Sequence, residues 1–228
     1  TDATAAWEKF PKQLWQGGEK VAVSGYADDL FTDRALDFLD RRREGPFFLY
    51  VAYVATHFTI AAPEDEVAKR RGRLPEPQAG KDLSAAYAGM VTRLDANVGR
   101  IVDRLDALGL RDDTLIVVTS DNGATFEAGN VGVSAALDSN RPFRGQKRTL
   151  WEGGVRVPGL ARWPGRIPAG KVSDEVVTLI DLLPTFAGAA GVAVDAAWKV
   201  DGGDVLPAWE GRSGVPGRTV FWRWGDEG

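Results

Sequence analysis

The sequence predicts an α/β fold in which a mostly parallel sheet is flanked by helices. Two short apolar runs, residues 47–54 and 114–119, are rich in aromatic and β-branched side chains and apolar on both alternating faces, as is typical of buried parallel strands. Each run follows a segment whose apolar residues recur at helical spacing. The order helix, strand, helix, strand favours a parallel sheet with right-handed crossovers.

The helices are predicted from periodicity and end signals. The first runs from Tyr26 to about residue 43, with acidic residues near its start and a basic run at its end, and it stops before Gly45. The second spans residues 83–108 and ends at the Gly109 cap. Between the first strand and this helix, residues 61–82 carry three prolines among charges and are expected to form a long irregular loop.

The C-terminal half predicts one more strand and one more helix. Residues 155–161 form a short apolar run that suits a strand. Residues 176–190 have a helical pattern that contains Pro184, so this helix must be kinked or must begin late.

Composition excludes several classes of site. The 228 residues include 28 Lys plus Arg against 32 Asp plus Glu, a net charge of −4, with one His and no Cys. Disulfide frameworks, thiolate zinc sites, cysteine nucleophiles and His-based metal clusters are therefore excluded. A slightly acidic chain is not typical of nucleic-acid binders, and the longest apolar run is far shorter than the ~20 residues that span a bilayer. We expect neither nucleic acid nor membrane as a partner.

Asp121 and Asn122 follow directly on the second predicted strand. Ligands of open α/β sheets bind at the carboxyl ends of strands. A carboxylate beside an amide carbonyl offers the hard oxygen donors that Ca²⁺ or Mg²⁺ selects. The alternative is that Asp-Asn-Gly forms an ordinary turn.

A basic set and a lone histidine are the other candidates. Arg141, Arg144, Lys147 and Arg148 lie within eight residues and suit an oxyanion such as sulfate or phosphate, although a solvated loop or a nucleic-acid patch would show the same charges. His57 follows the first predicted strand. A lone His is usually packed or solvent-facing, but here it is expected at the same sheet edge as the residues that follow the second strand.

Five segments together resemble the sulfatase family. They read FFLYVAY before His57, then TLIVVTSDNG (114–123), FRGQKRTLWEGGVRVP (143–158), ARWPG (161–165) and DLLPT (181–185). The combined string is specific, although DNG alone is not. The resemblance is closest to the arylsulfatase and N-acetylgalactosamine-6-sulfatase type and extends over essentially the whole chain.

The resemblance implies an alkaline-phosphatase-like fold and hydrolysis of sulfate esters of aryl or carbohydrate substrates. In this family a Cys or Ser in a C/S-x-P-x-R motif becomes formylglycine, whose hydrate attacks sulfur beside a calcium ion. By position, Asp121 and Asn122 match calcium ligands. Lys147 matches the lysine that contacts sulfate, and His57 matches the histidine that contacts sulfate and assists the leaving group. A periplasmic or extracellular parent protein is also implied.

The chain departs from the family pattern at the nucleophile. Its three P-x-R sequences have Asn140, Arg162 and Gly214 where the nucleophile should stand, and the family's N-terminal Asp pair is also missing. We therefore expect a sulfatase fragment that is inactive alone. Residues 1–190 would belong to a partial α/β catalytic domain whose N-terminal part is missing, and residues 191–228 would start a truncated C-terminal region. Two alternatives remain: a phosphate or phosphonate ester hydrolase of the alkaline phosphatase superfamily, or a non-catalytic module that binds anions or sulfated sugars.

Overall fold

The computed structural model describes residues 8–41, 45–125, 130–212, 214–215, 217–223 and 225. The chain folds as two units, each made of two stretches of sequence. The first unit comprises Thr1–Ala107 and Gly123–Val155, and the second comprises Leu108–Asn122 and Arg156–Gly228. Each unit is described by itself.

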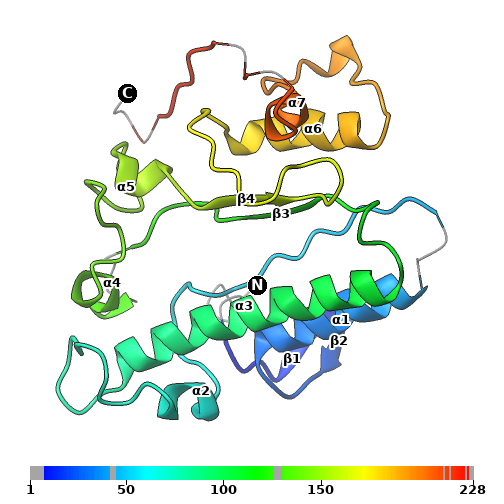
Figure 1. The fold of residues 1–228 in the computed structure, drawn as a ribbon. Helices are drawn as coiled ribbons and strands as arrows, with labels where there is room; N and C mark the ends of the chain where they lie inside the picture. Colours follow the sequence, from blue (N-terminus) through cyan, green and yellow to red (C-terminus); the bar gives the residue numbers. More distant parts are fainter. Residues whose placement is uncertain are drawn as a thin grey trace. The chain divides into compact units, whose positions relative to one another are not determined.

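Two long helices form the framework of the first unit. Helix α1 (Ala27–Arg41) begins with two aspartates and ends at Arg41, so the charges near both of its ends complement the helix dipole. Helix α3 (Leu83–Ala107) is followed by Gly109 with a φ of 72°, which confirms the predicted cap. Figure 1 shows α1 and α3 side by side. The last two residues predicted for the first helix, 42 and 43, lie outside the described residues.

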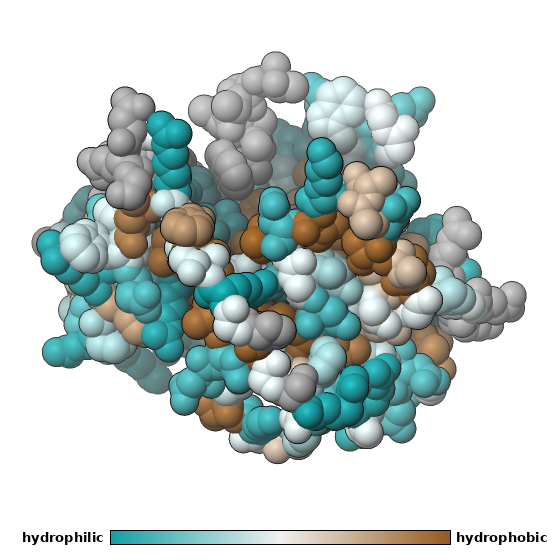
Figure 2. Space-filling model, turned by 90° about the horizontal axis from the view of Figure 1, so that it is seen from above, coloured by the Kyte–Doolittle hydropathy of each residue, from teal (hydrophilic) through white to brown (hydrophobic). Residues whose placement is uncertain are grey.

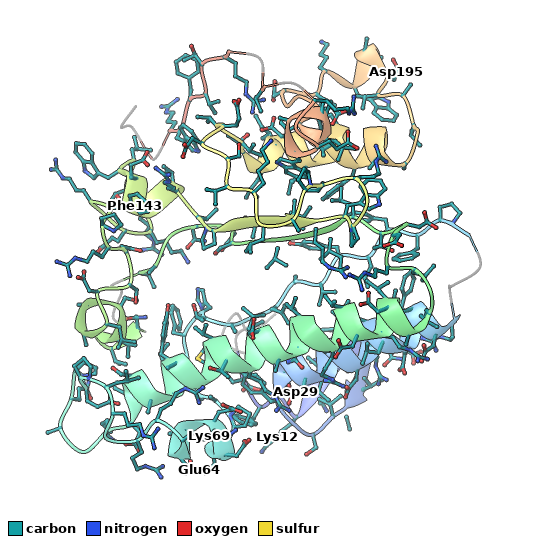
Figure 3. The ribbon with its side chains drawn as sticks, in the orientation of Figure 1. Lys12, Asp29, Glu64, Lys69, Phe143 and Asp195 are labelled. Carbon is teal, nitrogen blue, oxygen red and sulfur yellow. The ribbon has the colours of Figure 1, made fainter. Side chains whose placement is uncertain are left out.

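Ion pairs join α1 to α3. Asp29, labelled in Figure 3, accepts two hydrogen bonds of 2.7 Å from the Arg93 guanidinium and one of 2.8 Å from the Asn97 amide. Two further pairs, Arg100 with Asp33 and Arg104 with Asp40, follow along the same two helices. The three pairs link the two helices at successive points along their length.

The apolar core of the first unit lies against α3. Met90 and Ala85 are fully buried, and they pack with residues from the loop after His57, from α2 (Glu64–Ala68) and from α4 (Val133–Ala136). The short helix α2 interrupts the segment predicted as irregular. A hairpin of β1 (Gln13–Gln16) and β2 (Glu19–Ala22), antiparallel with Trp15 opposite Lys20, and the short helix α5 (Glu152–Val155) complete the unit.

The predicted buried strand at residues 47–54 is wrong for the part of the chain that the structure describes. The segment is extended, but no described strand pairs with it, and Phe48 and Tyr50 are 69% and 79% exposed. A strand buried on both faces needs neighbouring strands and covering layers, and local sequence cannot supply them. His57 follows this segment by three residues.

The second unit holds a two-stranded antiparallel sheet. Strands β3 (Ile116–Thr119) and β4 (Gly159–Arg162) pair with Val117 opposite Ala161. β4 begins later than predicted because Val155 belongs to α5 and Pro158, which cannot donate to a ladder, precedes it. Both described strand pairs are antiparallel, so the described residues do not show the predicted mostly parallel sheet.

Helices follow the sheet in the second unit. Helix α6 (Leu182–Ala189) begins after a 3₁₀ turn, η3 (Leu179–Asp181), so Pro184 lies in its first turn, where a backbone N–H has no partner within the helix. This confirms the late start. The turn η4 (Ala196–Trp198) and helix α7 (Leu206–Trp209) follow. Figure 2 shows apolar side chains at the surface among hydrophilic ones, and no described helix is long and apolar enough to cross a membrane.

Candidate functional site

His57 lies in a turn that its own backbone closes. Its N–H donates to the Val54 carbonyl at 3.0 Å, and its Nδ1 lies 3.0 Å from the Phe58 carbonyl oxygen. A carbonyl oxygen only accepts, so this contact is a hydrogen bond when Nδ1 carries a proton. In the neutral ring Nε2 is then the acceptor.

Lys147 meets His57 within the first unit. Its Nζ lies 3.5 Å from His57 Nε2, although the two residues are 90 positions apart in the chain. The ammonium can donate to the unprotonated Nε2, so the contact agrees with the tautomer that the Phe58 carbonyl favours. The structure therefore brings together the two residues that the sequence predicted to contact an oxyanion.

The turn that carries Lys147 is fixed by backbone and side-chain hydrogen bonds. Lys147 N–H donates to the Ala124 carbonyl at 2.9 Å, and the Thr149 hydroxyl donates to the Gln146 carbonyl at 2.7 Å. Asn140 bonds both the N–H and the carbonyl of Ala124 and also donates to the Gly145 carbonyl at 2.9 Å. Its amide thus joins the 123–125 segment to the Lys147 turn.

Two adjacent glycines let α5 approach this turn closely. A Cβ on Gly153 would lie 2.3 Å from the Gly145 carbonyl oxygen, and one on Gly154 would lie 2.2 Å from that of Thr149. Gly153 N–H donates to the Arg144 carbonyl at 2.7 Å. The glycine pair is therefore required by the close approach of two backbones beside Lys147.

Two of the other basic residues make contacts of their own. Arg141 lies 3.4 Å from the Asp138 carboxylate, and the Arg144 guanidinium stacks on the Trp151 ring at 3.7 Å from its centroid. Arg148 has a positive φ of 69° in the turn. The structure places the Lys147 ammonium at His57.

Asp121 and Asn122 belong to the second unit, directly after β3 and Ser120. The Ser120 hydroxyl donates to the Asn122 carbonyl at 3.0 Å, which shapes the turn. The structure does not test whether these two side chains share a site with His57 and Lys147, so that four-residue site stays a prediction.

The donor set at Asp121 and Asn122 suits a hard cation but is incomplete. Calcium takes about six to eight oxygens, and these two residues supply a carboxylate and an amide oxygen. Among the described residues, no group of three or more His, Asp or Glu side chains could hold a metal ion.

Sequence reasoning missed Asn140 and the glycine pair as parts of this site. In the sequence analysis Asn140 appears only as the residue at the nucleophile position of one P-x-R sequence. Nothing in the sequence indicates its hydrogen bonds. Gly153 and Gly154 follow Lys147 closely, and two adjacent glycines in an otherwise ordinary segment are a signal of close backbone approach.

Comparison with known proteins places the chain in a family. The family described as Sulfatase matches residues 3–192. N-acetylgalactosamine-6-sulfatase of Canis lupus familiaris is 35% identical over 223 residues, covering 96% of this chain and 38% of that protein. Steryl-sulfatase of Homo sapiens is 37% identical over 182 residues, covering 80% and 29%.

Solved structures give the same result. The crystal structure of Ps i-CgsB in complex with k-i-k-neocarrahexaose matches with a TM-score of 0.76 and 33% identity, over 89% of this chain and 42% of that one. The structure of BT4656 in complex with D-Glucosamine-2-N, 6-O-disulfate shares the fold, with a TM-score of 0.72 and 20% identity over 90% and 56%.

The chain belongs to the sulfatase family, as its sequence motifs predicted. It spans less than two fifths of the length of the curated relatives named above. The fold matches that of the Ps i-CgsB structure over most of the chain.

Proposed function

We propose that the full-length protein containing this chain hydrolyses sulfate esters, and that His57 and Lys147 bind the sulfate group. The observation that carries the proposal is the 3.5 Å contact between Lys147 Nζ and His57 Nε2, made by two segments of a chain of the sulfatase family. An ammonium and an imidazole side by side form a site for a small oxyanion.

The chemistry of the two side chains suits ester cleavage. The Lys147 ammonium balances negative charge that grows on the sulfuryl oxygens as the bond to the leaving group breaks. With Nδ1–H on the Phe58 carbonyl, Nε2 is the ring atom that faces Lys147. In the imidazolium form Nε2 carries a second proton, which His57 can give to the departing oxygen, leaving the neutral ring. With this proton the leaving group departs as a neutral alcohol, which is a better leaving group than an alkoxide.

Asp121 and Asn122 are the residues proposed to hold calcium. A bound dication supplies positive charge that stabilises the sulfuryl oxygens. The nucleophile is proposed to be a formylglycine outside this chain, because the chain has no Cys and no C/S-x-P-x-R motif. The isolated chain is accordingly expected to be inactive.

The proposal extends to the domain and the substrate. Residues 1–190 would be part of an alkaline-phosphatase-like catalytic domain with a mostly parallel sheet, and residues 191–228 would start the C-terminal region. Relatives named N-acetylgalactosamine-6-sulfatase and the BT4656 complex with a disulfated glucosamine support a carbohydrate sulfate ester as substrate, with aryl sulfates as small surrogates. A periplasmic or extracellular location of the parent is part of the same proposal.

The test is hydrolysis of 4-nitrophenyl sulfate by the full-length protein and its variants. We expect Lys147→Ala to lower kcat/KM by about 10²–10³-fold, the size typical of removing one charge-stabilising group. Arg141→Ala removes a cation of the same loop that pairs with Asp138, and it should stay within twofold of wild type. Near-normal hydrolysis by Lys147→Ala, or faster hydrolysis of 4-nitrophenyl phosphate than of the sulfate, would contradict the proposal.

A further inference from the structure

A buried carboxylate holds the backbone just before His57. Asp28 is the second residue of α1, and it is fully buried. Its Oδ1 accepts the Val54 N–H at 2.9 Å, and its Oδ2 accepts the Ala55 N–H at 3.2 Å. Buried carboxylates are rare because desolvation is costly, so one that binds two consecutive amides is a specific feature of this loop.

A buried lysine, Lys9, binds the backbone carbonyl of Val54, the residue whose N–H Asp28 accepts. Lys9 is 3% exposed, and its ammonium donates to the Val54 carbonyl, which also accepts the His57 N–H. Burial lowers the pKa of Lys9 to about 8, although the charge of Asp28 opposes this shift, and burial also raises the pKa of Asp28. Both shifts show that desolvation acts on this pair. The hydrogen bonds to Val54 help to offset that cost.

Tyr53 adds a third attachment to α1. The Thr32 hydroxyl donates its hydrogen to the Asp28 carbonyl at 2.7 Å. The Tyr53 hydroxyl, 2.9 Å from the Thr32 oxygen, is therefore the donor in that contact. Residues 53, 54 and 55 are thus all held by α1 or by Lys9, and His57 follows two residues later.

We propose that Asp28 is a positioning residue that, with Lys9, fixes residues 53–55 so that the His57 ring meets Lys147. The proposal rests on the proposed function, and it deepens that function by naming what orients the acid. Asp28 touches neither substrate nor ring. It acts through the backbone, because Val54 bears both the N–H that Asp28 accepts and the carbonyl that accepts the His57 N–H.

The chemistry of the carboxylate suggests the variant to use. A carboxylate presents two acceptor oxygens to two N–H groups, whereas an amide presents one oxygen and one NH₂. Asp28→Asn keeps the size of the side chain but places a donor against one of the two backbone donors. The segment must then shift, and His57 shifts with it.

The control is the neighbouring aspartate. Asp29→Asn also changes a carboxylate in the first turn of α1, but Asp29 binds Arg93 and Asn97 on α3. It therefore weakens α1 packing without changing the bonds from Asp28 to the backbone before His57. A purely structural effect would act on both variants alike.

The readout is the dependence on leaving group, measured on the full-length protein. A displaced general acid harms substrates with poor leaving groups more than substrates with good ones. For Asp28→Asn we expect kcat/KM for an alkyl sulfate to fall at least about tenfold more than kcat/KM for 4-nitrophenyl sulfate, because a misplacement of about 1 Å can cost about 10²-fold in rate. Asp29→Asn should keep the wild-type ratio within twofold. A wild-type ratio in folded Asp28→Asn would overturn the proposal.

A second variant covers the case in which Asp28→Asn does not fold. Lys9→Met removes the donor to the Val54 carbonyl and leaves both bonds of Asp28 in place, and the same shift in ratio is expected. An unchanged ratio in Lys9→Met would then overturn the proposal. Failure of the proposed function shows differently, as a wild-type protein that hydrolyses neither ester, and that result would overturn the positioning role too.

Discussion

The change Gly154→Ala adds one methyl group beside the turn that carries Lys147, and it should lower activity by displacing that turn. The Cβ of Gly154→Ala would lie 2.2 Å from the Thr149 carbonyl oxygen and 2.5 Å from that of Gln146. Ordinary contacts begin near 3.4 Å, so the turn between these residues must move by about 1 Å. Lys147 lies inside that turn, and its Nζ would move away from His57.

A displacement of about 1 Å in a positioned group can cost about 10²-fold in rate. We therefore expect Gly154→Ala to lower kcat/KM of the full-length protein for 4-nitrophenyl sulfate by about 10²-fold, measured by release of 4-nitrophenol. Gly99→Ala is the control, because Gly99 lies within α3 and a Cβ added there would meet nothing within 4 Å, so Ala should be neutral or slightly stabilising. Activity of Gly154→Ala within threefold of wild type would refute the reasoning.

Two stability predictions concern the units separately. Burial raises the pKa of Asp181, but bonds from Arg218 and from two backbone amides outweigh burial and lower this pKa to about 2. Because the unfolded chain binds this proton at higher pH than the folded chain, about 2 kcal/mol of stability should be present above pH 5 and lost as the pH falls from about 4 to 2. Acid titration of unfolding should show this loss, and Asp181→Asn should remove it; an equal slope in both proteins would contradict the assignment. Met90→Ala, at a fully buried position in the first unit, should cost about 2–5 kcal/mol in urea unfolding, and a cost below 1 kcal/mol would mean that the core is not packed around Met90.

Local patterns predicted α1, α3 and the late start of α6, missed the short helices, and failed for the first strand. The spacing of apolar residues and the Gly109 cap are properties of the α3 segment itself, so they could be found without the rest of the fold. Residues 47–54 have the composition of a buried strand, but pairing and covering depend on other parts of a protein. Composition therefore identified an extended segment and could not show its partners.

The sequence predicted the charged residues of the site but not the residues whose hydrogen bonds hold the backbone beside them. His57 and Lys147 were found from strand ends, from charge and from a family resemblance, and they meet across 90 positions. Asn140 and Asp28 act through hydrogen bonds to distant backbone, which leave no periodic or compositional signal. In the sequence, Asp28 indicated only a favourable interaction with the helix dipole.

The central claim is that His57 and Lys147 act together on one sulfate group, and a double-mutant cycle on the full-length protein tests it most directly. Contacting residues of one site are non-additive by about 0.5–3 kcal/mol. We predict that His57→Gln combined with Lys147→Ala loses clearly less kcat/KM toward 4-nitrophenyl sulfate than the product of the two single losses. A double variant whose loss equals that product would show that the two residues act independently and would contradict the account.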